Sequence, residues 1–76
     1  MIKDRIYEIA PKKDIADFDV DQLAKECNVA FQIIGYEPKN LENSVNEVFK
    51  SSHKPLELPD FILSVWLIDN AFAGDN

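Results

Sequence analysis

The sequence predicts an all-α fold: a small three-helix bundle, preceded by an N-terminal segment that is either a short helix or a strand. Three observations support this prediction. Apolar residues recur at three- and four-residue steps in two stretches of the chain, as they do on the buried side of a helix. Residues typical of helix ends flank these stretches. A third stretch, near the C-terminus, is apolar on nearly every side and is longer than a typical strand.

The chain has 76 residues, and we expect a single domain over residues 1–76. A domain of this size buries only about 60% of the surface that its unfolded chain exposes, which leaves a small margin of stability. Disulfides, a bound metal or oligomerisation often support cores below about 70–80 residues. Cys27 is the only cysteine and His53 the only histidine. Oligomerisation is therefore the expected support, and we expect a homodimer.

Residues 1–10 form the N-terminal segment, whose type the sequence leaves open. Ile2, Ile6 and Ile9 have helical spacing, whereas residues 5–9 also alternate as a short strand does. Pro11 ends either element, because proline lacks a backbone donor and disfavours a helix at the residue before it. We expect a loop from there to about residue 18.

The first long helix is expected over residues 19–36. Asp19 is a suitable N-cap, and Asp21 in the first turn complements the helix dipole. Gly35 and Pro38 end the helix. Its main apolar side holds Val20, Leu23, Ala24, Cys27, Phe31 and Ile34, and its opposite side holds Val29, Ile33 and Tyr36. The helix is thus either buried on two sides or broken near Asn28.

The next helix is expected over residues 40–51, with Asn40 as its cap and one narrow apolar stripe on an otherwise polar surface. A loop containing Pro55 follows it. The stripe consists of Leu41, Val45, Val48 and Phe49.

The last helix is expected over residues 60–72, because Pro59 suits a first helical turn. The Ile, Val, Phe and Trp content of this stretch leaves a strand as the alternative. Residues 73–76 are expected to be a frayed tail. On a helical wheel one side of this helix should close the core against Leu23, Phe31, Val45 and Phe49. That side holds Phe61, Val65, Ile68 and Phe72.

Leu63, Trp66 and Leu67 lie outside that side of the wheel and are the candidate partner-binding residues. A helix that is apolar nearly all round must be covered from several directions, and exposed apolar patches favour association. Trp66 has two interpretations. It is either a core residue that supplies bulk or an interface anchor, since Trp is enriched among residues that dominate binding energy.

Acidic residues outnumber basic ones by 14 to 8, which gives a net charge of -6. A nucleic-acid partner usually requires a basic patch, so the composition argues against nucleic acid. It also disfavours anionic membranes and suits a basic protein partner. The candidate acidic surface that would face such a partner comprises Asp14, Asp17, Asp19, Asp21 and Glu26.

No metal site or cofactor is expected. Asp17, Asp19 and Asp21 match the first ligands of an EF-hand calcium loop. However, Gln22 stands where that loop needs glycine, and Asn28 stands where it needs a bidentate glutamate.

No catalytic residue is expected either, so the chain is not predicted to be an enzyme. A nucleophile needs a base within hydrogen-bond reach. Cys27 falls on the predicted core side of a helix, Ser64 lies in an apolar run and His53 lies in a proline-containing loop. These positions favour a core thiol and an exposed loop histidine.

Residues 23–34 carry a second hypothesis. Ala24 occupies the place of a small residue where two helices cross, and Asn28 stands at the turn in place of the usual glycine. Val29 and Ile34 occupy apolar core positions. The stretch resembles a helix-turn-helix of the repressor and Cro type, which implies a degenerate two-helix motif over about residues 20–37 and a transcription regulator. Its second helix departs from the family, because residues 30–36 offer mainly Gln32 to DNA.

The leading hypothesis is a small acidic protein-protein interaction module. It would act as a regulator, inhibitor or accessory subunit, and would self-associate or dock through residues 60–72. The N-terminus lacks the apolar run of a signal peptide. The C-terminal apolar run contains Asp60, Asp69 and Asn70 and is shorter than the roughly 20 residues that span a bilayer. We therefore expect a soluble, cytoplasmic protein.

Overall fold

The computed structural model describes residues 1–52 and 56–73. Within these residues the chain forms four α-helices and one short 3-10 helix, so the all-α class is confirmed and the N-terminal segment is a helix. The expected loop after Pro11 contains the 3-10 turn. His53, Pro55 and residues 74–76 of the expected tail lie outside the described residues. The elements are α1 (Ile2–Ile9), η1 (Ile15–Asp17), α2 (Val20–Ile34), α3 (Leu41–Ser51) and α4 (Leu58–Ala73).

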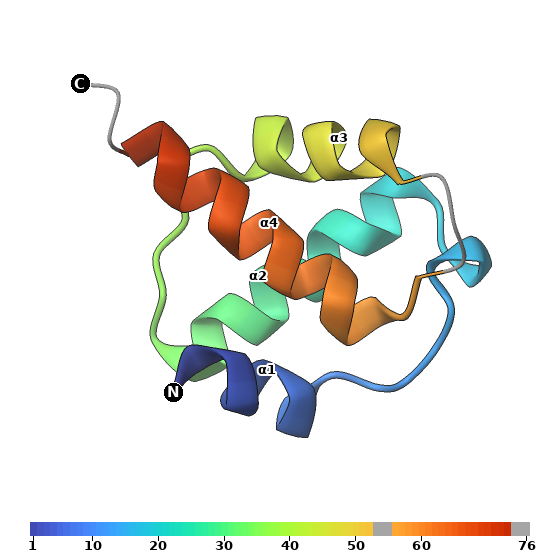
Figure 1. Cartoon of the computed structure of the whole chain (residues 1–76), viewed down its shortest axis with the longest axis horizontal. Helices are drawn as coiled ribbons and strands as arrows, with labels where there is room; N and C mark the ends of the chain where they lie inside the picture. The colour runs from blue at the N-terminus through green and yellow to red at the C-terminus, as the bar shows by residue number, and fades with distance from the viewer. Residues whose placement is uncertain (53–55, 74–76) are drawn as a thin grey trace.

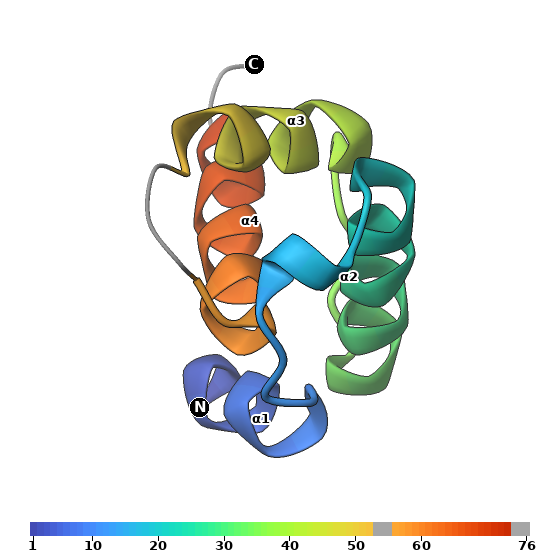
Figure 2. The ribbon, with the colours of Figure 1, turned by 90° about the vertical axis from the view of Figure 1, so that its right-hand side faces the viewer.

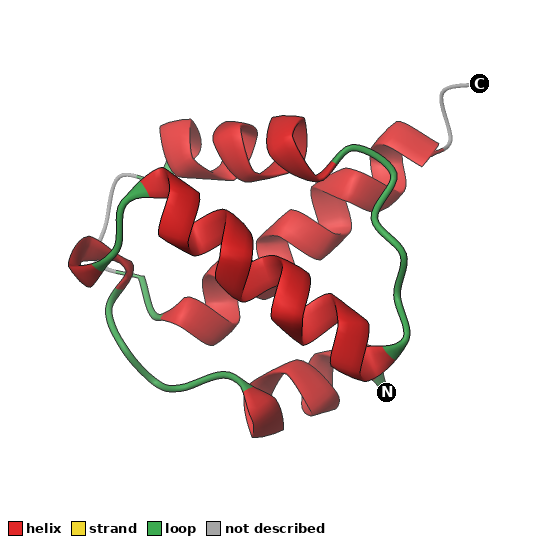
Figure 3. Cartoon of the chain, turned by 180° about the vertical axis from the view of Figure 1, so that it is seen from behind, coloured by secondary structure: helices red, strands yellow, loops and turns green. Residues whose placement is uncertain are grey.

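The four helices surround one core from four sides. α4 lies on the face toward the viewer in Figure 1, and α2 lies on the opposite face, which Figure 3 shows in front. α3 runs along one edge between these two helices and α1 runs along the other edge (Figure 2). The apolar core inside consists of Ile6, Ala10, Leu23, Cys27, Ala30, Phe31, Val45, Val48, Leu58, Phe61, Ile62 and Val65.

Both ends of α2 are fixed by its own sequence. At the start, Asp19 and Gln22 form a capping box, in which each side chain accepts a hydrogen bond of 2.8 Å from the other residue's backbone N–H. At the end, Gly35 adopts a left-handed conformation with φ of 78°, which lets the next N–H, that of Tyr36, donate to the carbonyl of Phe31. The rings of Phe31 and Tyr36 pack edge to face at 5.2 Å between centroids. This Schellman ending places Tyr36 above the core.

α2 is one continuous helix from Val20 to Ile34, so the two-helix arrangement implied by the resemblance to repressors is wrong for these residues. The helix neither breaks near Asn28 nor is buried on two sides. Val29 and Ile33 are instead 54% and 52% exposed. The physical reason is that residues 20–34 contain no glycine or proline, so that the backbone hydrogen bonds continue without a break between the two caps.

α4 starts two residues before its expected first residue, at Leu58. An antiparallel bridge between Asp14 and Glu57 precedes it. In this bridge, Leu58 N donates to the carbonyl of Lys13 at 2.7 Å, and Ile15 N donates to the carbonyl of Leu56 at 2.8 Å. These bonds hold the segment after α1 against the start of α4, where Leu58 is fully buried.

The core side of α4 differs from the expected one. Phe61 and Val65 are buried as expected, but Ile68 is 38% exposed and Phe72 is only half-buried. Phe49 of α3, expected in the core, is 43% exposed. The prediction was wrong for these three because the buried positions follow a different set of three- and four-residue steps. The buried residues of α4 are Leu58, Pro59, Phe61, Ile62, Val65 and Asp69.

Candidate functional site

A fully buried carboxylate, that of Asp69, joins α4 to the beginning of α3. Asp69 accepts hydrogen bonds from the backbone N–H of Lys39 at 2.7 Å, the backbone N–H of Asn40 at 2.8 Å and the Ser44 hydroxyl at 3.0 Å. The Tyr36 hydroxyl donates a fourth hydrogen bond. Asn40 was expected to cap α3, but its side chain makes no cap hydrogen bond. The correction is that a carboxylate from another helix accepts the N–H group of the N-cap residue Asn40 and that of Lys39 before it.

The four donors determine the charge state of Asp69. Burial by itself would raise the pKa of this carboxyl, but hydrogen bonds from Tyr36, Lys39, Asn40 and Ser44 stabilise the ionised form and bring the pKa below its ordinary value. The pKa of Tyr36 is raised by burial, by its hydrogen bond to Asp69 and by the Asp69 charge. Asp69 therefore stays ionised and Tyr36 stays protonated at neutral pH.

The burial of Asp69 leaves the outward side of α4 without charge over residues 61–72. Asp69 is the one ionisable residue between Phe61 and Phe72, and it points into the protein. Leu67 at 55% exposed, Ile68 and Ala71 are exposed, and Leu63 and Phe72 are half-buried. We call these five residues the α4 outer face.

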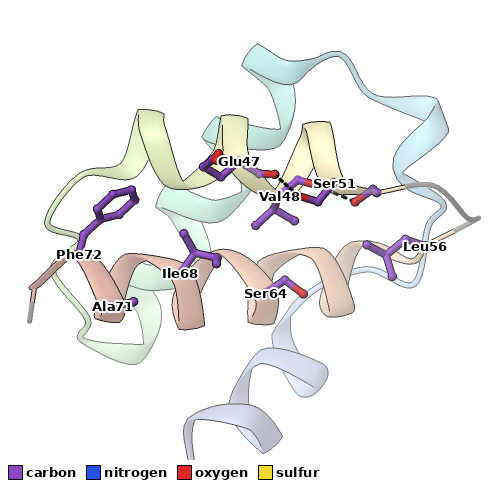
Figure 4. Close-up of a pocket in the computed structure, with 9 residues that line it drawn as sticks. Glu47, Val48, Ser51, Leu56, Ser64, Ile68, Ala71 and Phe72 are labelled. Carbon is purple, nitrogen blue, oxygen red and sulfur yellow. Dashed lines mark hydrogen bonds between the residues drawn. The ribbon is translucent and has the colours of Figure 1, made fainter.

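The α4 outer face borders a groove of about 530 Å³ between α3 and α4. Figure 4 shows Val48 and Ile68 pointing into the space between the two helices, with Phe72 at one end and Leu56 at the other. Two of the serine hydroxyls that line the groove donate to backbone carbonyls of α3: Ser51 to Glu47 and Ser52 to Val48. The groove thus has a largely apolar lining. Its lining residues are Glu47, Val48, Ser51, Ser52, Leu56, Ser64, Ile68, Ala71 and Phe72.

The structure separates the three candidate partner-binding residues. Leu67 is exposed, as expected. Leu63 and Trp66 are half-buried and pack against the core, which is compatible with the core interpretation of Trp66. The role of all three residues toward a partner stays a prediction. The Trp66 ring packs edge to face on Tyr36 at 6.2 Å between centroids. The Trp66 Nε1 atom is buried and has no hydrogen-bond partner within the described residues.

The five candidate acidic residues lie on η1 and α2 or directly beside them. Asp14 accepts from the backbone N–H of Ala16 at 2.9 Å, Asp17 ends η1, and Asp19 caps α2. Asp21 lines a groove between α2 and α3. Glu26 is half-buried beside Val29 and the end of α1. Their role toward a basic partner stays a prediction.

Cys27 is fully buried in the core, and burial raises the pKa of its thiol to about 12. It behaves as a small apolar residue. No group of three or more His, Cys, Asp or Glu residues in the described part of the chain could hold a metal ion. In the same residues, every helix is too short or too polar to cross a membrane.

Asp69 is the structural residue that sequence reasoning missed. A signal for it was present, since a single acid inside an apolar helix has to be either exposed or hydrogen-bonded. Its position four residues after Val65 places it on the buried side. Comparisons with known protein families, curated proteins and solved structures found no match to this chain, so the surfaces described above are what inform its function.

Proposed function

We propose that the chain is a small acidic protein-protein interaction module that acts as a regulator, inhibitor or accessory subunit. It binds another protein surface through the α4 outer face. The observation that carries this proposal is an exposed side of α4 that has no charged residue over residues 61–72, on a chain with a net charge of -6. Charged residues are depleted at the centres of protein interfaces, and contiguous exposed apolar surface marks interaction sites.

The α3–α4 groove supports the same proposal. Its floor is formed by aliphatic and aromatic side chains such as Val48, Ile68 and Phe72. Two of its three hydroxyls already donate to the backbone of α3, so that the Ser64 hydroxyl and the exposed Glu47 carboxylate are its other polar side-chain groups. An apolar side chain from a partner would shield the floor from water, and this burial contributes about 25 cal/mol of favourable free energy per Å² of apolar surface.

The exposed apolar residues of α2 provide a useful contrast. Val29 and Ile33 are as exposed as Leu67, but the pocket that they line has a volume of only about 30 Å³ and also contains the Glu26 side chain. Leu67, in contrast, continues into Ile68, Ala71 and the groove.

This contrast provides the test. The chain is tagged at Met1, which is 93% exposed, and captured from its source cells as the wild type, Leu67→Asp or Val29→Asp. We expect at least one protein, or a second copy of the chain, to be retained by the wild type and by Val29→Asp. Its recovery should fall about tenfold with Leu67→Asp, which corresponds to about 1.4 kcal/mol of binding energy. Circular dichroism checks that both variants fold.

A protein set that is the same for all three chains would contradict the proposal. So would equal losses with both variants, because a general effect of added negative charge would then explain them. A second copy is identified by sedimentation of the purified chain, since self-association raises the sedimenting mass with concentration.

A further inference from the structure

A second groove lies on the side of α3 that faces α2. It has a volume of about 560 Å³ and is formed by the first halves of the two helices. Figure 3 shows α2 on this face of the molecule, with α3 along its edge. The floor is apolar, with half-buried Val20, Ala24 and Leu41 and fully buried Val45. Asp21 of α2, Glu42 of α3 and half-buried Asn46 complete the lining.

Both carboxylates of this groove are free to act on a partner. Asp21 and Glu42 are exposed, and the only ion pair among the described residues joins Arg5 and Glu8. Neither acid is needed as a helix cap. Asp19 caps α2, and Asp69 accepts the backbone N–H groups of Lys39 and Asn40, just before the first residue of α3.

The lining of the groove contains no basic side chain. An anionic occupant would therefore meet two carboxylates with no positive side chain to offset them. A neutral apolar occupant would contact the floor but leave the two exposed carboxylates without a partner. A cationic occupant with apolar side chains complements both the floor and the rim.

We propose that the α2–α3 groove binds a segment of another protein in which basic and apolar side chains alternate. The apolar side chains lie on the floor, and the basic side chains reach Asp21 and Glu42. This surface is separate from the α4 outer face, because the two grooves lie on different sides of α3 and share no lining residue. The inference goes beyond the proposed function and does not depend on it.

The experiment uses the full chain and a fluorescent hexapeptide in which arginine and leucine alternate. Binding of the peptide is measured by fluorescence anisotropy. The groove variant is Asp21→Asn with Glu42→Gln. The matched control is Asp4→Asn with Glu37→Gln, which removes the same charge from two exposed acids outside the groove. A second peptide, with serine in place of leucine, tests the apolar floor.

We expect the groove variant to weaken binding of the arginine-leucine peptide by about fivefold or more, with the control within about twofold of the wild type. The serine peptide should bind more weakly than the leucine peptide, and Leu67→Asp should not reduce binding. The affinity should fall as salt rises.

Equal losses in the groove variant and in the control would overturn the proposal, because attraction to the net charge of the chain would then explain binding. Absence of binding at low salt would also overturn it. Loss with Leu67→Asp alone would assign the peptide to the α4 outer face and remove the α2–α3 groove as its site.

Discussion

Asp69→Asn is expected to lower the free energy of unfolding by about 3 kcal/mol, because hydrogen bonds to a charged group contribute about 1.5–3 kcal/mol each and are not additive. The asparagine keeps the shape of the side chain, but an NH₂ group replaces one of the two acceptor oxygens and faces groups that are themselves donors. The backbone N–H groups of Lys39 and Asn40 would then lack part of their acceptor. In a domain of this size the midpoint of thermal unfolding should fall by roughly 12–24 °C.

Two further variants control this prediction. Asp60→Asn also neutralises an acid of α4, but Asp60 accepts a single side-chain hydrogen bond, from Tyr7, and its loss should cost about 1 kcal/mol. Tyr36→Phe removes one of the four donors to Asp69, keeps the aromatic ring and should cost about 1 kcal/mol. It keeps the prediction testable if Asp69→Asn does not fold. Urea unfolding measures all three, and equal effects of Asp69→Asn and Asp60→Asn would contradict the account.

The contribution of Asp69 should also depend on pH. Its pKa is lowered in the folded protein relative to the ordinary value of 3.8, so the unfolded chain binds the proton more readily. The stability that Asp69 contributes is therefore complete above about pH 4–5 and is lost as the pH falls through the folded pKa. The difference between the wild type and Asp69→Asn should be constant from pH 5 to 7 and shrink below pH 4.

The second large effect separates two isoleucines on α4. Ile62 is 1% exposed and Ile68 is 38% exposed. Ile62→Ala should lower the free energy of unfolding by about 2–5 kcal/mol, because it removes buried methylene groups and leaves a cavity. Ile68 borders the groove, so Ile68→Ala should lower the free energy of unfolding by about 1 kcal/mol or less.

This pair is matched in residue type, in substitution and in helix, so helix propensity cancels between the two variants. Urea denaturation gives both values at one pH. The helical wheel placed Ile68 in the core and therefore predicts the larger loss of stability for Ile68→Ala. A larger loss for Ile68→Ala than for Ile62→Ala would support that orientation of α4 and contradict the structure.

Local signals in the sequence predicted the fold class and the ends of α2. The capping residues Asp19 and Gly35 act through hydrogen bonds within a few residues of the chain, which is why their pattern can be recognised without a structure. The core residues of α2 were predicted for the same reason. Leu23, Cys27 and Phe31 repeat at four-residue steps, and all three are fully buried.

The orientation of α4 could not be predicted in this way. Its sequence is apolar on nearly every side, so a helical wheel offers several sides of similar hydrophobicity. The choice between them is made by contacts from distant parts of the chain. Lys13 receives a hydrogen bond at the start of α4, and Tyr36, Lys39 and Asn40 donate to Asp69 near its end.

The orientation of α4 also decides which residues are available to a partner. Leu67 is exposed, as predicted. Trp66 packs on Tyr36, and Ile68 lines the groove instead of the core. Three of the predicted acids, Asp14, Asp17 and Asp19, lie on or beside η1 and the α2 cap. The acidic surface toward a basic partner stays a prediction.

Covalent capture at the α4 outer face tests the central claim most directly. A photo-crosslinking amino acid is placed at position 67 or at position 29, since Leu67 and Val29 are 55% and 54% exposed. After irradiation in the source cells, position 67 should give a discrete adduct, of twice the chain mass if a second copy covers the face and of another mass if a different protein does. Position 29 should give none. No adduct at position 67, or the same adduct from both positions, would contradict the claim that α4 presents an interaction surface.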